Sequence, residues 1–548
     1  METPDVDVLV VGAGPVGLTL AIALRRLSLS VRVVDKAPGT NREPRADVLF
    51  PRAGEALGAI GAGEAIRKHS FEMQGANFYG SGRHLGSFRV GRLQTRYPRA
   101  MTIEQHEIEA LLDEQLTQLG VEVEWRTALL DLRQHDDSVT VALRRPDGET
   151  ETVRAAWAVG CDGLRSTVRD RLGIAFEGER RKNMQVVQGN VEPTWHLPDQ
   201  PGHGYFFLAP YRSVIAFPTP AGGYRIFCVR DDPEPDRTQP PTLDELRDLV
   251  AEAAGIPDLK LTLTDPVWLS RARFADRVAA SLRDGRVLLA GDAAHAWAPI
   301  GGHGMNVGMI GAHNLAWKLA AVHRGEATDA VLDSYSTEQR AFAAGVIRDM
   351  RMNIMEMLLP PSLHRIRSAF LRVGLPTQGF QRRSEFMMSD FGRHHRRSPL
   401  SWQRTGRFGR GLRAGDRLPD IPVLPAVVPS PGPVADRPAA SADGRPVPLH
   451  DLLGYHRWTL LLARPHADGP TLDRLRSICA AAAAPIEVVP IAVAGPRDSA
   501  QMGPADRMIL VRPDGYVALV APVGRPDVVR DYLATFLPSN PIPARRLP

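Results

Sequence analysis

Residues 7–35 read DVLVVGAGPVGLTLAIALRRLSLSVRVVD, the pattern of a strand, a glycine-rich turn, a helix and a second strand. Gly12, Gly14 and Gly17 form a G-x-G-x-x-G motif where the helix begins. Glycines allow the tight turn and the close approach of a pyrophosphate, while the N-terminus of the helix attracts the anion. Asp35 ends the second strand, where a carboxylate accepts ribose hydroxyl groups. The stretch therefore predicts a Rossmann-like domain that binds FAD or NAD.

Residues 287–319, VLLAGDAAHAWAPIGGHGMNVGMIGAHNLAWKL, indicate which dinucleotide binds. Asp292 follows a buried strand, where its carboxylate can accept hydrogen bonds from a polyol chain, and only a flavin has a ribitol. The glycines of PIGGHGMN allow backbone N–H groups to approach a flat ring, and the helix that follows presents its positive end. A reduced, anionic flavin requires this environment. We therefore expect FAD.

The composition excludes several classes of function. The 548 residues include 67 Lys and Arg against 62 Asp and Glu, and the basic residues are interleaved with acidic ones, which does not favour nucleic-acid binding. Cys161, Cys228 and Cys479 are far apart and form no C-x-x-C pair, so we expect no disulfide framework, no metal site and a reducing cytoplasm. The N-terminus has no basic region before its apolar run, which ends in glycines, and the most apolar later stretch is interrupted by Pro485, Glu487 and Pro490, so we expect neither a signal peptide nor a membrane span.

The patterns predict an α/β protein of several domains. The expected units are an FAD-binding domain of residues 1–70, 101–174 and 281–330; an antiparallel β-sheet domain of residues 71–100 and 175–280, which binds substrate; a helical segment of residues 331–400; and a small α/β domain of residues 410–548. Prolines are dense between residues 417 and 448, which indicates a connector.

The chain resembles the single-component, FAD-dependent aromatic hydroxylases of the p-hydroxybenzoate hydroxylase type, and within them the larger phenol and aromatic-polyketide hydroxylases. The resemblance rests on GAGPVG with Asp35, on CDG at residues 161–163, on GDAAH at residues 291–295 and on PIGGHGMN. The last unit resembles the thioredoxin-like domain of the larger members, without the C-x-x-C of a dithiol enzyme.

The resemblance implies roles for particular residues. The expected cofactor-binding residues are Gly12, Gly14, Pro15, Val16, Gly17, Asp35, Lys36, Arg45, Gln105, Asp162, Gly163, Asp292, Pro299, Gly302, Gly304, Met305 and Asn306. Arg45 matches an arginine near the flavin ring of many members; the alternative is that it pairs with a surface acid. Cys161 is expected to be a small buried residue because nothing near it supplies a base.

His303 departs from the family pattern, because relatives mostly carry glutamine there. A protonated histidine would support the negative charge of the reduced flavin, whereas a neutral one would only replace the glutamine. We list Arg45 and His303 as the candidate catalytic residues. The sequence singles out no base that would deprotonate a phenolic substrate.

Aromatic residues in the predicted sheet are candidates for the wall of a dry substrate pocket. Strand alternation allows only about half of such residues to face the pocket. The residues that we assign to it are Tyr205, Phe207, Phe217 and Phe227.

The resemblance implies that the protein hydroxylates an aromatic substrate, phenolic or polyketide, through a flavin C4a-hydroperoxide, with NAD(P)H and O₂ as co-substrates. We expect a monomer or homodimer. Only five of the 67 basic residues are lysine, which agrees with a GC-rich bacterial genome and antibiotic biosynthesis. Two alternatives stay open: Baeyer-Villiger oxidation or epoxidation of a polyketide, and a non-catalytic flavin-binding partner of other pathway enzymes.

Overall fold

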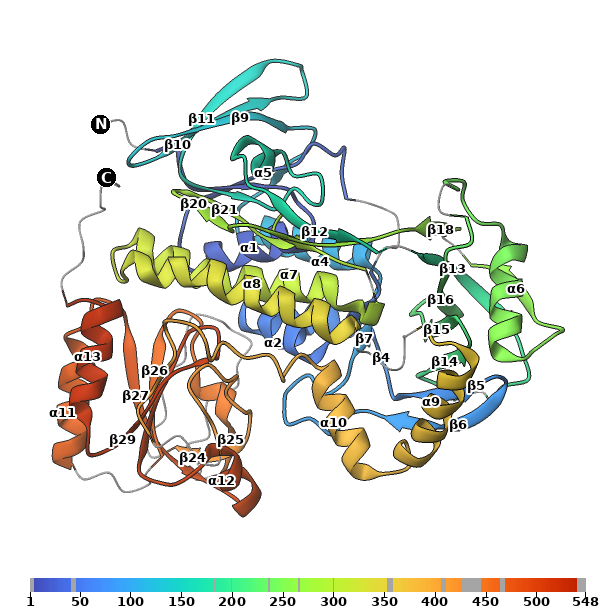
Figure 1. Ribbon diagram of the computed structural model, residues 1–548. Helices are drawn as coiled ribbons and strands as arrows, with labels where there is room; N and C mark the ends of the chain where they lie inside the picture. Colours follow the sequence, from blue (N-terminus) through green and yellow to red (C-terminus); the bar gives the residue numbers. More distant parts are fainter. Residues whose placement is uncertain are drawn as a thin grey trace.

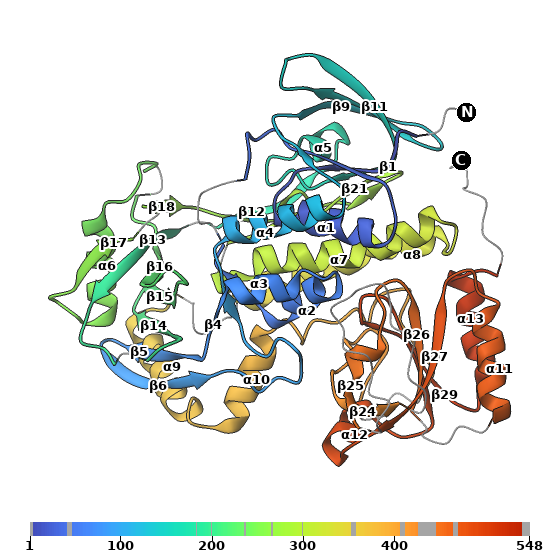
Figure 2. The same cartoon turned by 180° about the vertical axis from the view of Figure 1, so that it is seen from behind.

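The computed structural model describes residues 4–539 except residues 41–45, 182, 199, 235–236, 265–266, 299, 352–357, 406–410, 426–444 and 464–468. Two long helices, α7 (His303–His323) and α8 (Asp329–Arg351), cross the middle of the molecule (Figure 1). The domain built on the second sheet, described below, lies beyond one end of these helices. The C-terminal domain lies on the other side of the molecule (Figures 1 and 2). No helix in the described part of the chain could span a membrane.

The N-terminal domain is built on a largely parallel sheet with the strand order β20-β21-β11-β1-β2-β8. The central strand β1 is apolar and buried from Val8 to Val11, as parallel strands covered on both sides require. The hairpin β9-β10 extends the sheet from β11. The strands are β1 (Val6–Val11), β2 (Val31–Val34), β8 (Val123–Glu124), β9 (Ala128–Gln134), β10 (Val139–Arg144), β11 (Thr150–Gly160), β20 (Arg283–Asp284) and β21 (Val287–Leu289).

Helices α1 (Pro15–Arg26), α4 (Gln105–Gln118) and α7 lie on the side of the sheet away from β9 and β10 (Figure 1). Glycines permit the close crossing of α1 and α7. A Cβ atom on Gly308 would lie 2.5 Å from Val16 Cγ2, and one on Gly291 would lie 2.9 Å from the same atom. The N-termini of both helices are therefore brought to the same edge of the sheet. The shorter helices of this domain are α2 (Pro51–Ala59), α3 (Gly63–His69) and α5 (Thr167–Arg171).

The second sheet has the order β17-β13-β16-β15-β14-β5-β6 and is antiparallel except for the pair β14 and β5. Helix α6 (Leu243–Ala254) packs on one face, and the opposite face meets α9 (Pro361–Gly374) and α10 (Gln378–Met388). The strands are β5 (Gly75–Gly80), β6 (Arg83–Arg89), β13 (Met184–Thr194), β14 (His203–Ala209), β15 (Arg212–Pro218), β16 (Tyr224–Asp231), β17 (Lys260–Leu263) and β18 (Leu269–Ala272), the last paired with β13.

Short strands connect the two domains. β3 and β4 pair with β7, and β19 pairs with β12 and β22. Their bounds are β3 (Val48–Leu49), β4 (Phe71–Glu72), β7 (Met101–Thr102), β12 (Phe176–Arg180), β19 (Ala275–Ala279) and β22 (His295–Ala296).

The C-terminal domain has the thioredoxin-like arrangement of a mixed sheet with helices beside it. Its strand order is β23-β29-β28-β26-β27-β24-β25, and α11 packs against α13. Cys479 on α11 is buried, and burial raises its pKa to about 12, as expected for a packing residue. The elements are β23 (Trp402–Gln403), β24 (Pro422–Pro425), β25 (Val447–Pro448), β26 (Trp458–Leu462), α11 (Gly469–Ala480), β27 (Ile486–Val493), α12 (Pro496–Met502), β28 (Arg507–Val511), β29 (Val517–Pro522) and α13 (Pro526–Phe536).

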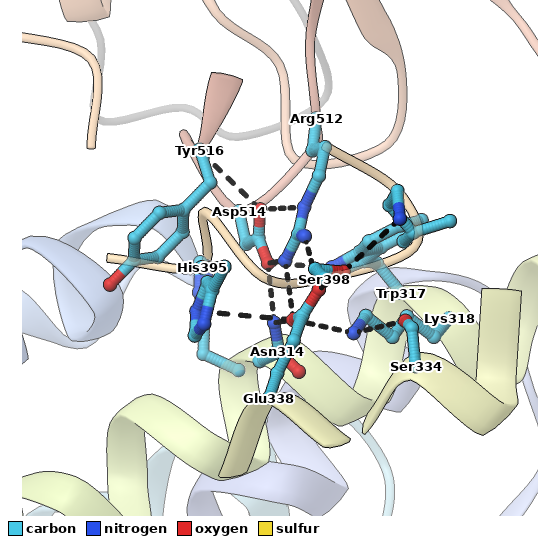
Figure 3. A network of polar contacts seen from close by, with 12 residues as sticks. Asn314, Trp317, Lys318, Ser334, Glu338, His395, Ser398, Arg512, Asp514 and Tyr516 are labelled. Atoms are coloured by element: carbon cyan, nitrogen blue, oxygen red, sulfur yellow. Dashed lines mark hydrogen bonds and ion pairs between the residues drawn. The ribbon is translucent and has the colours of Figure 1, made fainter. Parts of the chain in front are cut away.

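A buried polar network attaches the C-terminal domain to α7 and α8 (Figure 3). Glu338 on α8 receives hydrogen bonds from both Arg512 Nη atoms, at 2.6 and 3.0 Å, and from Lys318 Nζ at 2.7 Å. Asp514 accepts hydrogen bonds from Asn314 at 2.7 Å and from Trp317 at 3.0 Å, besides its ion pair with Arg512. The cations hold the pKa values of Glu338 and Asp514 below their usual range, so both carboxylates stay ionised.

Candidate active site

A single cavity of about 2300 Å³ connects the N-terminal domain with the second sheet. Its wall includes the glycine turn after β1, the loop before α7, one face of the sheet, and residues of α9 and α10. Sites for one small molecule usually measure about 300–1000 Å³. The cavity is therefore large enough for a dinucleotide and a second molecule.

The glycine turn forms a cradle at one end of this cavity. Gly12 has φ of +110°, and a Cβ atom on it would lie 2.3 Å from the carbonyl oxygen of Cys161. A Cβ atom on Gly14 would meet nothing within 4 Å, and no side chain caps the N-terminus of α1. Pro15 and Val16 line the cavity, whereas Gly17 lies beneath the turn. Open backbone at an uncapped helix N-terminus suits a pyrophosphate.

Asp35 braces the turn as well as facing the cavity. Its two carboxylate oxygens accept the backbone N–H groups of Ala13 at 2.7 Å and of Ala37 at 2.8 Å. Both Asp35 and Lys36 line the cavity. The carboxylate is thus held beside the glycine turn.

We expect Asp35→Ala to weaken FAD binding by about 10- to 100-fold, because each hydrogen bond to a carboxylate contributes about 1.5–3 kcal/mol. Fluorescence titration of the deflavinated protein with FAD measures this change. Asp131→Ala is the control, because the Asp131 side chain is 68% exposed and forms only a surface ion pair. Equal affinity in the two variants would exclude a role for Asp35.

Asp162, Gly163 and Gln105 also line the cavity. Asp162 accepts the backbone N–H of Val168 at 3.1 Å, and burial raises the pKa of its carboxyl. Gln105 is the first residue of α4 and donates to Glu109 at 2.8 Å. Burial also raises the pKa of Cys161, so its thiol stays protonated and is a poor nucleophile.

The loop before α7 provides the edge against which a flat ring can lie. Gly302, Gly304, Met305 and Asp292 line the cavity. Gly302 has φ of +71°, and no side chain caps α7. Asn306 does not line the cavity, because its amide is used within the protein: it accepts from Phe50 N at 2.7 Å and donates to the carbonyl oxygens of Val48 and Gly302. Asn306 thus shapes the loop.

Of the two candidate catalytic residues, only His303 lies in the described part of the chain. Arg45 lies outside the described residues, as does Pro299. His303 begins α7, lines the cavity and stacks on Phe50 with the ring centroids 4.7 Å apart. Its Nδ1 atom lies 3.0 Å from Asp390 Oδ2. The Asp390 contact was not expected.

Two of the four aromatic residues that we assigned to the substrate pocket line the cavity, and two do not. Phe217 and Phe227 line the cavity, together with Phe206. Tyr205 and Phe207 do not, because they project from the opposite face of β14 and pack in the core under α6. Phe206 pairs with Ile215, and Ile215 pairs with Phe227, so the register places these three side chains on one face.

Three polar residues that were not predicted from the sequence, Asp47, Gln188 and Arg225, also line the cavity beside this aromatic wall. Arg225 lies over the ring of Trp268 at 4.3 Å and donates to Asn190 Oδ1 at 2.5 Å. Burial raises the pKa of Asp47, and the nearby Arg225 opposes that shift. A signal for Arg225 was present, since it lies two residues before Phe227 on the same strand and therefore shares its face.

The described residues contain no group of His, Cys, Asp and Glu side chains arranged to hold a metal ion.

Comparison with known proteins gives two family matches. Residues 5–350 match the model described as an FAD binding domain, and residues 429–538 match the model of the aromatic-ring hydroxylase C-terminal region. A 6-methylpretetramide 4-monooxygenase of Streptomyces rimosus is 33% identical over 540 residues, which cover 94% of this chain and 91% of the relative.

Solved structures agree with the sequence matches. The OxyS anhydrotetracycline hydroxylase of Streptomyces rimosus has a TM-score of 0.72 at 30% identity, covering 98% of this chain and all of the other. Aklavinone-11 hydroxylase, solved in a ternary complex with FAD and aklavinone, has a TM-score of 0.75 at 27% identity, covering 98% of this chain and 99% of the other.

Proposed function

The chain belongs to the FAD-dependent aromatic-ring hydroxylases, and from this premise we propose that it is a single-component monooxygenase that uses NAD(P)H and O₂ to hydroxylate a phenolic or polyketide aromatic compound in bacterial natural-product biosynthesis. The observation that carries the proposal is the continuous cavity, which brings the glycine cradle, the loop before α7 and the aromatic wall together. A cofactor and an aromatic substrate can therefore meet inside one cavity.

FAD fits the residues present. The glycine turn and the N-terminus of α1 would hold its pyrophosphate, Asp35 its ribose, and Asp292 its ribitol. When bound, FAD supplies the redox chemistry, which protein side chains lack. The loop of Gly302, Gly304 and Met305 would border its ring, with the positive end of α7 directed at it.

The aromatic wall would position the substrate and exclude water. Phe206, Phe217 and Phe227 form a face for a planar ring, and Asp47 and Arg225 offer hydrogen-bonding groups for its oxygen substituents. A site that combines apolar contact with a few fixed polar groups holds a reacting carbon in one orientation.

The test is NAD(P)H oxidation by the FAD-loaded protein in ¹⁸O₂, with phenols, naphthoquinones and polycyclic polyketides as candidate substrates. We expect one class to accelerate NAD(P)H oxidation and its product to gain one labelled oxygen atom on an intact carbon skeleton. A ring-opened or ester product would indicate Baeyer-Villiger oxidation, and an epoxide would indicate epoxidation. Unchanged oxidation with every compound would support the non-catalytic alternative and contradict the proposal.

A further inference from the structure

His303 and Asp390 form a dyad at the wall of the cavity. His303 Nδ1 lies 3.0 Å from Asp390 Oδ2, although the two residues are 87 positions apart. The His303 side chain is 12% exposed, whereas that of Asp390 is fully buried. Among the described residues the other ring nitrogen, Nε2, has no hydrogen-bond partner, and His303 lines the cavity. The carboxylate therefore lies behind the imidazole, and Nε2 is the nitrogen left to meet a ligand.

The surroundings fix both members of the dyad. Phe50 stacks on the imidazole with an angle of 29° between the rings, which sets the ring plane. Asp390 follows α10 in a left-handed conformation with φ of 62°, and the carbonyl of the preceding Ser389 accepts the backbone N–H of Arg52 at 3.2 Å. These contacts attach the carboxylate to the N-terminal domain. A histidine orientated in this way is pre-organised for proton transfer.

Charged groups behind Asp390 hold its side chain in place. Arg393 Nε lies 3.5 Å from Asp390 Oδ1, and Arg393 Nη1 lies 2.5 Å from Asp349 Oδ2 at the end of α8. The groups that face His303 are thus Asp390 from the turn after α10, backed by Arg393 and Asp349, and the apolar Phe50 from the start of α2. One carboxylate therefore contacts the imidazole, and an aromatic ring covers its face.

We propose that His303 is the base that accepts the phenolic proton of the substrate, and that Asp390 is the positioning residue that holds its ring. This inference rests on the proposed function and supplies the group that it lacks. The substrate O–H bond breaks, the electron pair stays on the phenolate oxygen, and an Nε2–H bond forms. Asp390 keeps Nδ1 protonated and stabilises the resulting imidazolium, and the proton leaves to solvent after product release. An electron-rich phenolate is the form of the ring that reacts with an electrophilic oxygen.

The test measures ionisation of a bound phenol without turnover. The probe is alizarin, a planar dihydroxyanthraquinone whose visible absorption band shifts when it loses a proton. It is bound to the full-length, FAD-loaded protein, and its spectrum is recorded against pH after subtraction of the flavin spectrum. We expect the ionisation constant of the bound dye to exceed that of the free dye by about 10- to 100-fold, the effect of one charge-assisted hydrogen bond.

Three variants separate chemistry from structure. His303→Gln keeps a side chain that can bond to Asp390 but removes the proton acceptor, so the ionisation constant should return to that of the free dye. Asp390→Asn should give an intermediate value. Glu385→Gln is the matched control, because Glu385 is equally buried near the end of α10 but accepts only the backbone N–H groups of Gly91 and Arg92, at 2.6 and 2.9 Å. It should behave as the wild type.

A second measurement on the wild type needs no variant. If His303 takes the proton, ionisation of the dye on binding should release almost none to a weakly buffered solution, whereas loss to solvent releases one per dye. Full proton release, an unshifted ionisation constant in the wild type, or an unchanged shift in His303→Gln would each overturn the dyad. Labelled oxygen in the product together with any of these results would leave the monooxygenase proposal standing.

Discussion

Gly17→Ala is expected to give a folded but colourless protein that loses its FAD on desalting. A Cβ atom at position 17 would lie 1.9 Å from the carbonyl oxygen of Gly12 and 3.3 Å from Cys161 Cβ. The first of these is a backbone atom, so it cannot rotate away, and the turn between β1 and α1 must move. Overpacking of this kind costs about 1–3 kcal/mol in stability. Because the displaced turn is the pyrophosphate cradle, we expect FAD affinity to fall by more than about 100-fold.

The measurement is the ratio of flavin to protein absorbance after desalting, together with the thermal midpoint of the apoprotein. Gly14→Ala is the matched variant, because a Cβ atom there would meet nothing within 4 Å and the φ of Gly14 is −73°. It should keep the wild-type midpoint and lose affinity only because the new methyl group lies where the pyrophosphate approaches. Retention of both FAD and thermal midpoint in Gly17→Ala would contradict the assignment of this turn.

Local patterns were sufficient for the α/β fold class and for FAD. The glycine turn and the loop before α7 are short segments, and several glycines in or beside them permit close packing. Gly308, for example, allows α7 to touch Val16. Such features are encoded by residue type and spacing, which are readable without a structure.

When a strand is buried on both faces, its sequence does not show which side chains project from which face of the sheet. Residues 204–209 of β14 are all buried, so the aromatic run contains no polar residue that marks the outer face. The assignment of Tyr205 and Phe207 to the cavity was therefore wrong by one residue, which moves every side chain to the opposite face. Only the pairing with β15 and β16 fixes which face meets α6.

The contact between His303 and Asp390 could not be predicted from the sequence for a different reason. His303 begins α7 and Asp390 follows α10, and nothing in the spacing of residues across α8, α9 and α10 brings them together. The polar network of the C-terminal domain has the same origin: Arg512 and Glu338 are 174 positions apart. Contacts of this kind follow from domain packing, so the residues that attach the C-terminal domain could not be predicted from the sequence.

We expect the largest loss of stability when the buried polar network around Arg512 is broken. Arg512 is fully buried, and it is shared by Glu338 of α8 and Asp514 of its own domain (Figure 3). Lys318 provides another positive charge on Glu338, and burial lowers its pKa to about 8 even so. Replacement of Arg512 by glutamine would leave two buried carboxylates with a single neighbouring lysine. A buried charge that loses its partner costs about 3–5 kcal/mol.

We therefore expect Arg512→Gln to lower the free energy of unfolding by about 3–5 kcal/mol and to separate the unfolding of the C-terminal domain from that of the N-terminal domain. Differential scanning calorimetry should show a lower or divided transition, and limited proteolysis should cleave between the two domains earlier than in the wild type. Arg530→Gln is the control, because Arg530 and Asp531 form an exposed pair, each side chain 61% accessible, and such pairs contribute only about 0–1 kcal/mol. If the two variants unfold alike, the network does not hold the domains together, and the apolar contacts between Trp317 and Trp458, whose ring centroids lie 5.4 Å apart, must do so instead.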